Sequence, residues 1–250
     1  MGKLKMSRDN YFGLRHRNIT LSCLLIFILQ FLLLGCSVPA STKVVNAGGD
    51  VQTISTGYFK HFVALNNHSQ SDAAVVVFID GDGSPWKTKR QISRDPTSPA
   101  PLLLNWFLAS NFSSAYLGRP CYFSLNDDQC SAYWYTHGRY SERVVASMVN
   151  ALEQLLDSRM LILVGHSGGG TLAMLMAERM DNVAMVVTIA GNLNVTAWAE
   201  YHQYTPLTGS LDPMVDLMLT APIHQAHFYS PYDDVIKAAW VKSFVSKQTN

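Results

Sequence analysis

The chain has 250 residues, of which 48% are hydrophobic, and its formal net charge is +1 at pH 7. This length fits one good-sized domain plus an appendage, and the apolar content is sufficient for a hydrophobic core. Lys and Arg form no basic stripe, so nucleic acid is not expected as a partner.

The N-terminus has the pattern of an export signal. Its first stretch, "MGKLKMSRDNYFGLRHRN", carries five Lys and Arg against one Asp, and the following "ITLSCLLIFILQFLLLGC" is almost wholly apolar. A basic segment followed by an apolar one is typical of a secretory signal peptide. The ending "LLGC" resembles a bacterial lipobox, which implies that Cys36 is lipidated and becomes the mature N-terminus. An uncleaved anchor is the alternative, because the apolar run is about long enough to span a bilayer.

This pattern divides the chain into three parts. Residues 1–35 are predicted to be a signal peptide, 36–50 a tether, and 51–250 the exported domain. We expect the lipid to attach the protein to a bacterial membrane. Ser37 stands where an aspartate tends to hold such proteins at the inner membrane, so we expect the outer membrane, with the domain facing the periplasm.

Two cysteines, Cys121 and Cys130, belong to the predicted exported domain. Export into an oxidising compartment favours a disulfide between them, which would close the loop "YFSLNDDQ". A pair of buried free thiols is the alternative.

Strand-like and helix-like segments alternate along the domain. The composition predicts strands at 57–67, 73–80, 113–119, 160–165, 183–191 and 223–230, and helices at 99–111, 141–157, 169–180 and 234–247. Ser141 is a plausible N-cap for the second helix. The alternation predicts an α/β fold with a mainly parallel sheet flanked by helices, in which ligands bind beyond the carboxyl ends of the strands.

The stretch "VGHSGGGT" lies between a predicted strand and a predicted helix. A phosphate-binding loop would need a lysine after the glycines, and the dinucleotide pattern Gly-x-Gly-x-x-Gly does not occur here. The stretch does match Gly-x-Ser-x-Gly, with Ser167 between Gly165 and Gly169. In that motif a strained turn exposes the serine hydroxyl above the sheet, and small residues let strand and helix crowd together. The motif predicts that Ser167 is a nucleophile; tight packing alone is the alternative.

With this motif the exported domain resembles an α/β-hydrolase over nearly all of its length. It also resembles a group of bacterial α/β-hydrolase-fold lipoproteins that have "Gly-Asp-Gly" after the third strand and "Arg-Pro-Cys" after the fourth. Here these segments are "VVVFIDGDGSPW" at 75–86 and "AYLGRPC" at 115–121. The resemblance implies a serine esterase or related acyl hydrolase that acts on a small-molecule acyl substrate. No metal is expected, because neither His-Glu-x-x-His nor Cys-x-x-Cys occurs in the sequence, and no cofactor is expected.

The same resemblance assigns further site residues. The N–H of Gly168 and one at Asp82 or Gly83 are expected to form the oxyanion hole; an ordinary turn is the alternative for the second loop. Asp233 is the expected acid of the triad. Asp234 is the expected cap of the last helix, and Asp212 is a weaker candidate for the acid.

The general base is not evident. In α/β-hydrolases the histidine follows the acid after one more strand, but no histidine follows His227 before Asn250. We interpret the chain as a hydrolase that lacks its last strand and histidine segment. A catalytically inactive binding or envelope-associated lipoprotein is the alternative. Four histidines of the chain are considered as the base, and each is expected to be structural instead: His166, His202, His224 and His227.

Overall fold

The computed structural model describes residues 38–68, 74–219 and 223–248. The chain divides into two compact units, Met1–Val38 and Pro39–Asn250. The predicted signal peptide and Cys36 lie outside the described residues. Within the described ranges, no helix is long and apolar enough to cross a membrane.

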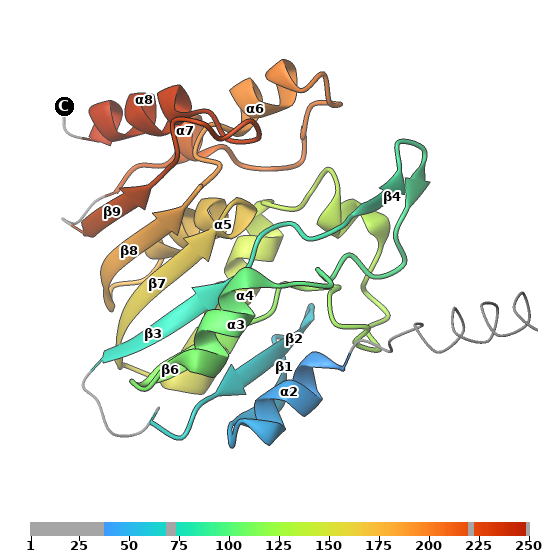
Figure 1. Ribbon diagram of the computed structural model, residues 1–250, viewed down its shortest axis with the longest axis vertical. Helices are drawn as coiled ribbons and strands as arrows, with labels where there is room; N and C mark the ends of the chain where they lie inside the picture. The colour runs from blue at the N-terminus through green and yellow to red at the C-terminus, as the bar shows by residue number, and fades with distance from the viewer. Residues whose placement is uncertain (1–37, 69–73, 220–222, 249–250) are drawn as a thin grey trace, which may run out of the picture. The chain divides into compact units, whose positions relative to one another are not determined.

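A mainly parallel sheet forms the centre of the second unit (Figure 1). Its seven strands follow the order β1-β2-β6-β3-β7-β8-β9. The pairs from β6 to β9 are parallel, whereas β2 is antiparallel to both of its neighbours. The strands are β1 (Asp50–Ser55), β2 (Lys60–Leu65), β3 (Ala74–Ile79), β6 (Ser114–Leu117), β7 (Met160–His166), β8 (Val183–Ile189) and β9 (His224–Phe228). The six strands predicted from the sequence are therefore present.

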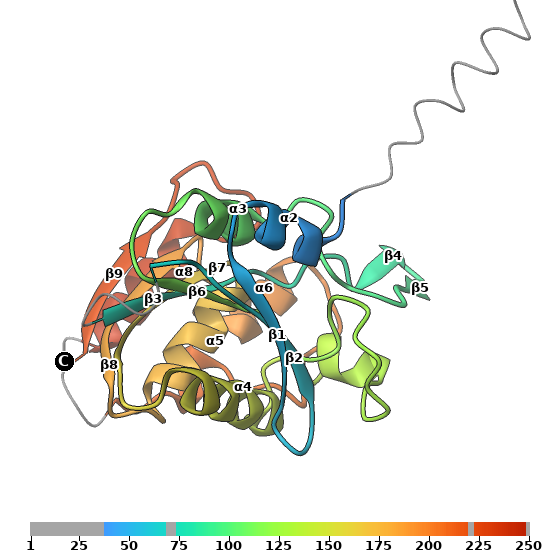
Figure 2. The ribbon, with the colours of Figure 1, turned by 90° about the horizontal axis from the view of Figure 1, so that it is seen from below.

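Helices cover both faces of this sheet, as Figure 2 shows. Helices α2 (Ala40–Asn46) and α3 (Leu102–Ala109) lie on one face, and α4 (Glu142–Leu156) and α5 (Gly168–Ala177) on the other. The remaining helical segments are η1 (Ala132–Tyr135), α6 (Val195–Tyr201), α7 (Pro213–Asp216) and α8 (Ala238–Gln248). A separate two-stranded hairpin is formed by β4 (Trp86–Thr88) and β5 (Gln91–Ile92). The predicted α/β architecture with helices on a parallel sheet is confirmed.

Burial of apolar side chains explains why these segments form a sheet and its covering helices. The continuous apolar run of β3 packs into two clusters, with Val75, Val77 and Ile79 on one side and Phe78 on the other. A strand covered on both faces needs such an uninterrupted apolar sequence. The N-cap of α4 is also as predicted, because the Ser141 hydroxyl accepts from the N–H of Val144 at 3.4 Å.

The expected tether is partly folded, which corrects the predicted boundary at residue 51. Residues 40–46 form α2, and β1 begins at Asp50. Val44 of this helix is completely buried in the cluster that contains Phe62 and Leu103. A single buried valine is too weak a local signal to predict a helix, since its packing partners lie far along the chain.

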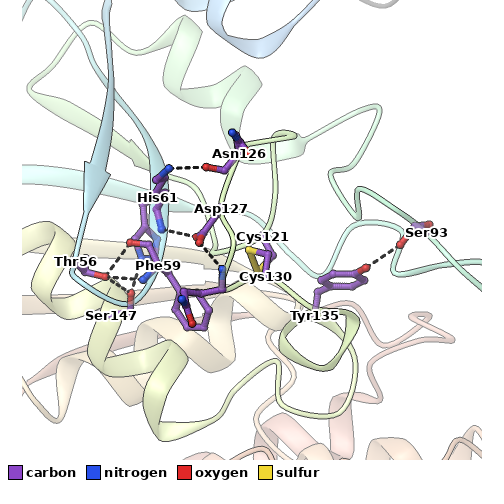
Figure 3. Close-up of a disulfide and its surroundings, with 12 residues drawn as sticks. Thr56, Phe59, His61, Ser93, Cys121, Asn126, Asp127, Cys130, Tyr135 and Ser147 are labelled. Carbon is purple, nitrogen blue, oxygen red and sulfur yellow. Dashed lines mark hydrogen bonds between the residues drawn. A yellow bond between two sulfur atoms is a disulfide. The ribbon is translucent and has the colours of Figure 1, made fainter.

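The predicted disulfide between Cys121 and Cys130 is confirmed (Figure 3). The two Cα atoms lie 5.3 Å apart, which is within the range of disulfide geometry. The loop that they close also contacts β2, because the Asp127 carboxylate accepts from the N–H of Lys60 at 2.8 Å.

A buried histidine, His61 of β2, lies in the same region (Figure 3). Its Nδ1–H donates to the carbonyl of Gly118 at 3.0 Å, and its Nε2 is 2.7 Å from the hydroxyl of Ser147 on α4. This arrangement fixes the neutral tautomer, with Nε2 as an acceptor. The pKa of His61 is lowered from 6.5 to about 4, mainly because the ring is buried.

Candidate active site

Ser167 lies on a sharp turn between the end of β7 and the start of α5. Its backbone is in a strained conformation, with φ 51° and ψ −120°. Backbone hydrogen bonds hold this turn: the N–H of Ser167 donates to Ile189 at 2.9 Å, and its carbonyl accepts from Gly170 and Asn192 at 2.9 and 3.1 Å. A non-glycine residue at such angles persists only where the surroundings enforce it, and such residues cluster at functional sites.

The two outer glycines of the motif are required by close packing. A Cβ added at Gly165 would lie 2.3 Å from the carbonyl oxygen of Gly169. A Cβ at Gly169 would lie 2.1 Å from the carbonyl oxygen of Ile79. Only glycine allows β7, β3 and the first turn of α5 to approach this closely.

The loop after β3 lies against this turn. A Cβ at Gly81 would be 3.2 Å from the Cβ of Ser167, and a Cβ at Gly168 would be 2.3 Å from Oδ1 of Asp82. The structure thus brings together Ser167, Gly168 and the loop that was expected to supply the second oxyanion donor. The N–H of Gly168 is the first of α5, a position that has no partner within a helix.

The Asp82 side chain has a role that the sequence analysis missed. Its carboxylate accepts hydrogen bonds from Arg119, from Arg139 at 2.9 Å and from the Tyr140 hydroxyl at 2.6 Å. The hydroxyl of Tyr122 donates to the Asp82 carbonyl at 2.9 Å. Burial alone would raise the pKa of Asp82, but the two guanidinium groups and the Tyr140 hydroxyl hold it well below its usual range. This buried cluster fixes the loop beside Ser167.

The order of the strands in the sheet explains the contact between Asp82 and Arg119, and knowledge of that order could have predicted it. Asp82 and Arg119 follow β3 and β6, which are parallel neighbours in the sheet. Residues after neighbouring parallel strands meet at the same edge, so "Gly-Asp-Gly" and "Arg-Pro-Cys" lie side by side. The other aspartate of the loop, Asp80, has a different role: its carboxylate accepts from Leu103 and Leu104 at 3.0 Å each and caps α3.

The two candidate acids, Asp233 and Asp212, and the expected helix cap Asp234 lie in different environments. Oδ1 of Asp233 accepts from the N–H groups of Val235 and Ile236 at 2.8 and 2.9 Å. Asp233, rather than the predicted Asp234, therefore caps the turn before α8. Asp234 is 98% exposed and pairs with Lys237 at 3.0 Å.

Asp212, the weaker candidate, is buried and caps two helices. Its carboxylate accepts from Val195 and Thr196 at the start of α6, at 3.0 and 2.8 Å. It also accepts from Met214 in α7 at 3.1 Å. These bonds assign Asp212 a structural role.

Two of the four histidines considered as bases, His202 and His227, are engaged elsewhere. Nε2 of His202 donates to the carbonyl of Val235 at 2.9 Å, and the ring stacks on Tyr204 with centroids 5.4 Å apart. His227 contacts Thr188 and Gln225 at 2.8 and 3.1 Å, and burial lowers its pKa. Among the described residues, no histidine is hydrogen-bonded to the Ser167 hydroxyl.

Comparison with known proteins agrees with this architecture. The sequence model of a family described as the alpha/beta hydrolase fold matches residues 110–208. An esterase of Pyrococcus furiosus is similar in structure at 11% identity and a TM-score of 0.55, with 87% of this chain and 83% of that chain covered. No curated protein matches the sequence.

Two larger proteins contain a similar unit. Prolyl oligopeptidase B of Galerina marginata aligns at 13% identity and a TM-score of 0.56, over 80% of this chain and 30% of that chain. A puromycin hydrolase aligns at 13% identity and a TM-score of 0.51, over 79% and 33%. The chain thus spans about a third of the length of these two proteins. At these identities the comparisons establish the fold, and the fold is that of the α/β-hydrolases.

Proposed function

We propose that this protein is a serine hydrolase that acts on esters or similar small acyl substrates, with Ser167 as the nucleophile. The observation that carries the proposal is the strained turn at Ser167, between the carboxyl end of β7 and the N-terminus of α5. A fold alone does not define an activity, because one fold supports many reactions. The proposal therefore depends on the geometry at Ser167.

The surrounding groups suit acyl transfer. Attack of the Ser167 hydroxyl on a carbonyl would produce a tetrahedral oxyanion, and the N–H of Gly168 with that of Asp82 or Gly83 would hold it. The N-terminus of α5 also favours negative charge at this position. Asp82 assists through its side chain, because its bonds to Arg119, Arg139 and Tyr140 keep the loop in place before substrate binds.

Asp233 remains the proposed acid, which would orient a histidine and stabilise its imidazolium form. Its Oδ1 already binds two backbone N–H groups of its own loop. The absence of a described histidine bonded to Ser167 favours a second candidate function, an inactive binding protein on the same fold. Loss of a triad member lowers turnover by orders of magnitude, although an oxyanion hole and binding leave residual catalysis.

Export and lipid attachment are also part of the proposal. The disulfide between Cys121 and Cys130 supports it, because disulfides persist in oxidising compartments such as the bacterial periplasm. We propose a lipid on Cys36 and a location on the periplasmic side of the outer membrane. Mass spectrometry of the mature N-terminus tests this, and an unprocessed chain beginning at Met1 would contradict it.

The activity is tested with a p-nitrophenyl ester series and three proteins. The unmodified chain is expected to hydrolyse short esters slowly, Ser167→Ala to lose this activity, and Ser158→Ala to retain it. Ser158 is the matched control because it is an exposed serine on the turn before β7. Equal rates for all three proteins would remove Ser167 from the mechanism.

A further inference from the structure

The β4–β5 hairpin projects from the body of the second unit, immediately after the loop beside Ser167 (Figures 1 and 2). Its base is anchored by two backbone bonds: the N–H of Ser84 donates to Pro96 at 2.7 Å, and that of Ser93 donates to Pro85 at 2.8 Å. The hydroxyl of Tyr135 donates to the Ser93 carbonyl at 2.9 Å. The hairpin therefore extends from a fixed base.

The surface of this hairpin is strongly basic. Residues 84–94 contain four basic side chains and no acidic one, and all four are exposed: Lys87, Lys89, Arg90 and Arg94. Within the described residues, none of the four forms an ion pair. The whole chain has 19 Lys and Arg against 18 Asp and Glu, so the rest of the protein is net negative.

Two apolar side chains accompany these charges. Trp86 and Ile92 are directly opposite each other in the hairpin register, and they are 42% and 37% exposed. Directly opposed residues in an antiparallel pair project on the same face. The hairpin thus presents an indole and an aliphatic group together, and it also carries the four cations that form no ion pair with the described residues.

We propose that this hairpin is a docking element for an anionic phospholipid surface. Basic side chains bind anionic headgroups, and tryptophan is favoured at the boundary between headgroups and acyl chains. The exposed Trp86–Ile92 pair favours a lipid surface over a soluble acidic polymer, which would match the charge alone. Docking through this hairpin places the loop at Gly81 to Gly83 next to the membrane surface.

Lysine acetylation of the full chain tests the proposal, with the chain reconstituted into vesicles and modified by N-hydroxysuccinimidyl acetate. Each basic residue at an anionic surface strengthens binding about fivefold. Acetylation of Lys87 and Lys89 is therefore expected to fall by about fivefold or more on phosphatidylglycerol-containing vesicles, compared with phosphatidylcholine alone. Lys242, exposed on α8, is expected to react equally on both. This local readout is independent of attachment by other parts of the chain.

Substitutions separate the contributions of the basic residues and of Trp86 to this protection from acetylation. Arg90→Glu with Arg94→Glu keeps both reporter lysines and is expected to lose the protection. Lys242→Glu with Lys247→Glu makes the same charge change on α8 and is expected to retain it. Trp86→Ser is expected to weaken the protection on the same vesicles, and Ser167→Ala to leave it unchanged, since the proposal does not rest on the catalytic role.

Three results would overturn the proposal. The first is equal acetylation of Lys87 and Lys89 on both vesicle types. The second is protection that survives Arg90→Glu with Arg94→Glu. The third is protection by dextran sulfate that equals protection by the vesicles and does not change in Trp86→Ser, because this result would indicate an acidic polymer as the partner.

Discussion

The Asp82 carboxylate links its own loop to side chains from two other segments of the chain. Arg119 follows β6, whereas Arg139 and Tyr140 precede α4. Two guanidinium groups share one carboxylate in a place where little water reaches them, so removing the carboxylate leaves two buried cations without a counterion. Removing one partner of a buried ion pair lowers stability by more than the intact pair contributes, because the charge that remains is neither paired nor solvated.

Asp82→Asn is therefore expected to lower the free energy of unfolding by roughly 3–5 kcal/mol, measured by urea denaturation. Asp234→Asn is the matched control, because Asp234 pairs with Lys237 but is 98% exposed. Its expected change is below about 1 kcal/mol. Equal stability of the two variants would show that the Asp82 cluster does not hold the loop.

The contribution of His61 to the free energy of unfolding depends on pH. Its pKa is about 4 in the folded protein against 6.5 for an ordinary histidine, so folding favours the neutral form. The contribution is complete above pH 6.5, declines as the pH falls from 6.5 towards 4, and is lost below that. The pKa difference corresponds to roughly 3 kcal/mol.

His61→Gln is expected to remove this dependence. Urea denaturation between pH 4 and pH 7 should show that the difference in stability between the unmodified chain and the variant shrinks as the pH falls. His224→Gln, at an exposed histidine of β9, is the control and should keep the original slope. A constant difference across this range would mean that His61 is not buried in its neutral form.

At the scale of single residues, sequence predicted Ser167 and its glycines but not the Asp82 cluster. The motif at Ser167 is local, since five consecutive residues define the turn. The partners of Asp82 lie 37, 57 and 58 residues away. Charge pairs at such separations depend on strand order, which composition and periodicity do not encode.

At the scale of elements, the approach of α5 to β3 depends on Gly169. Its Cβ would lie 2.1 Å from the Ile79 carbonyl oxygen and 2.6 Å from that of Asp80. Backbone atoms of a central strand cannot move aside without breaking the ladder, so a methyl group here displaces the helix.

Gly169→Ala is therefore expected to lower the free energy of unfolding by roughly 3 kcal/mol and to disturb the Ser167 turn. Gly57→Ala is the comparison: Gly57 has a φ of +80°, unlike the helical Gly169, and no atom lies within 4 Å of an added Cβ. Backbone strain alone is expected to cost roughly 1–2 kcal/mol there. Thermal and urea denaturation compare the two variants, and an equal loss in both would show that packing at Gly169 is not tight.

Long, strongly patterned elements were predictable, and short ones were not. The apolar run of β3 and the amphipathic pattern of α4 are complete within their own segments. By contrast, the first turn of α6 donates to the carboxylate of Asp212, which lies 17 residues from Val195. This part of α6 depends on a contact between distant segments, and the same is true of α2.

At the scale of the whole molecule, the alternation of strands and helices was enough to predict a parallel sheet flanked by helices. The alternation did not predict the order of the strands, because that order depends on which face of the sheet each connecting helix crosses. β9 lies at one edge of the described sheet and pairs with β8. The proposed lack of a further strand and its histidine stays a prediction.

We propose that the fold presents Ser167 as a reactive nucleophile. Labelling of the folded chain with a fluorophosphonate probe, followed by mass spectrometry of the peptides, tests this most directly. We expect one adduct, on Ser167, that is absent from urea-unfolded protein and from Ser167→Ala but present in Ser158→Ala. A folded chain that takes up no probe at Ser167 would contradict the claim and would support an inactive binding protein on the α/β-hydrolase fold.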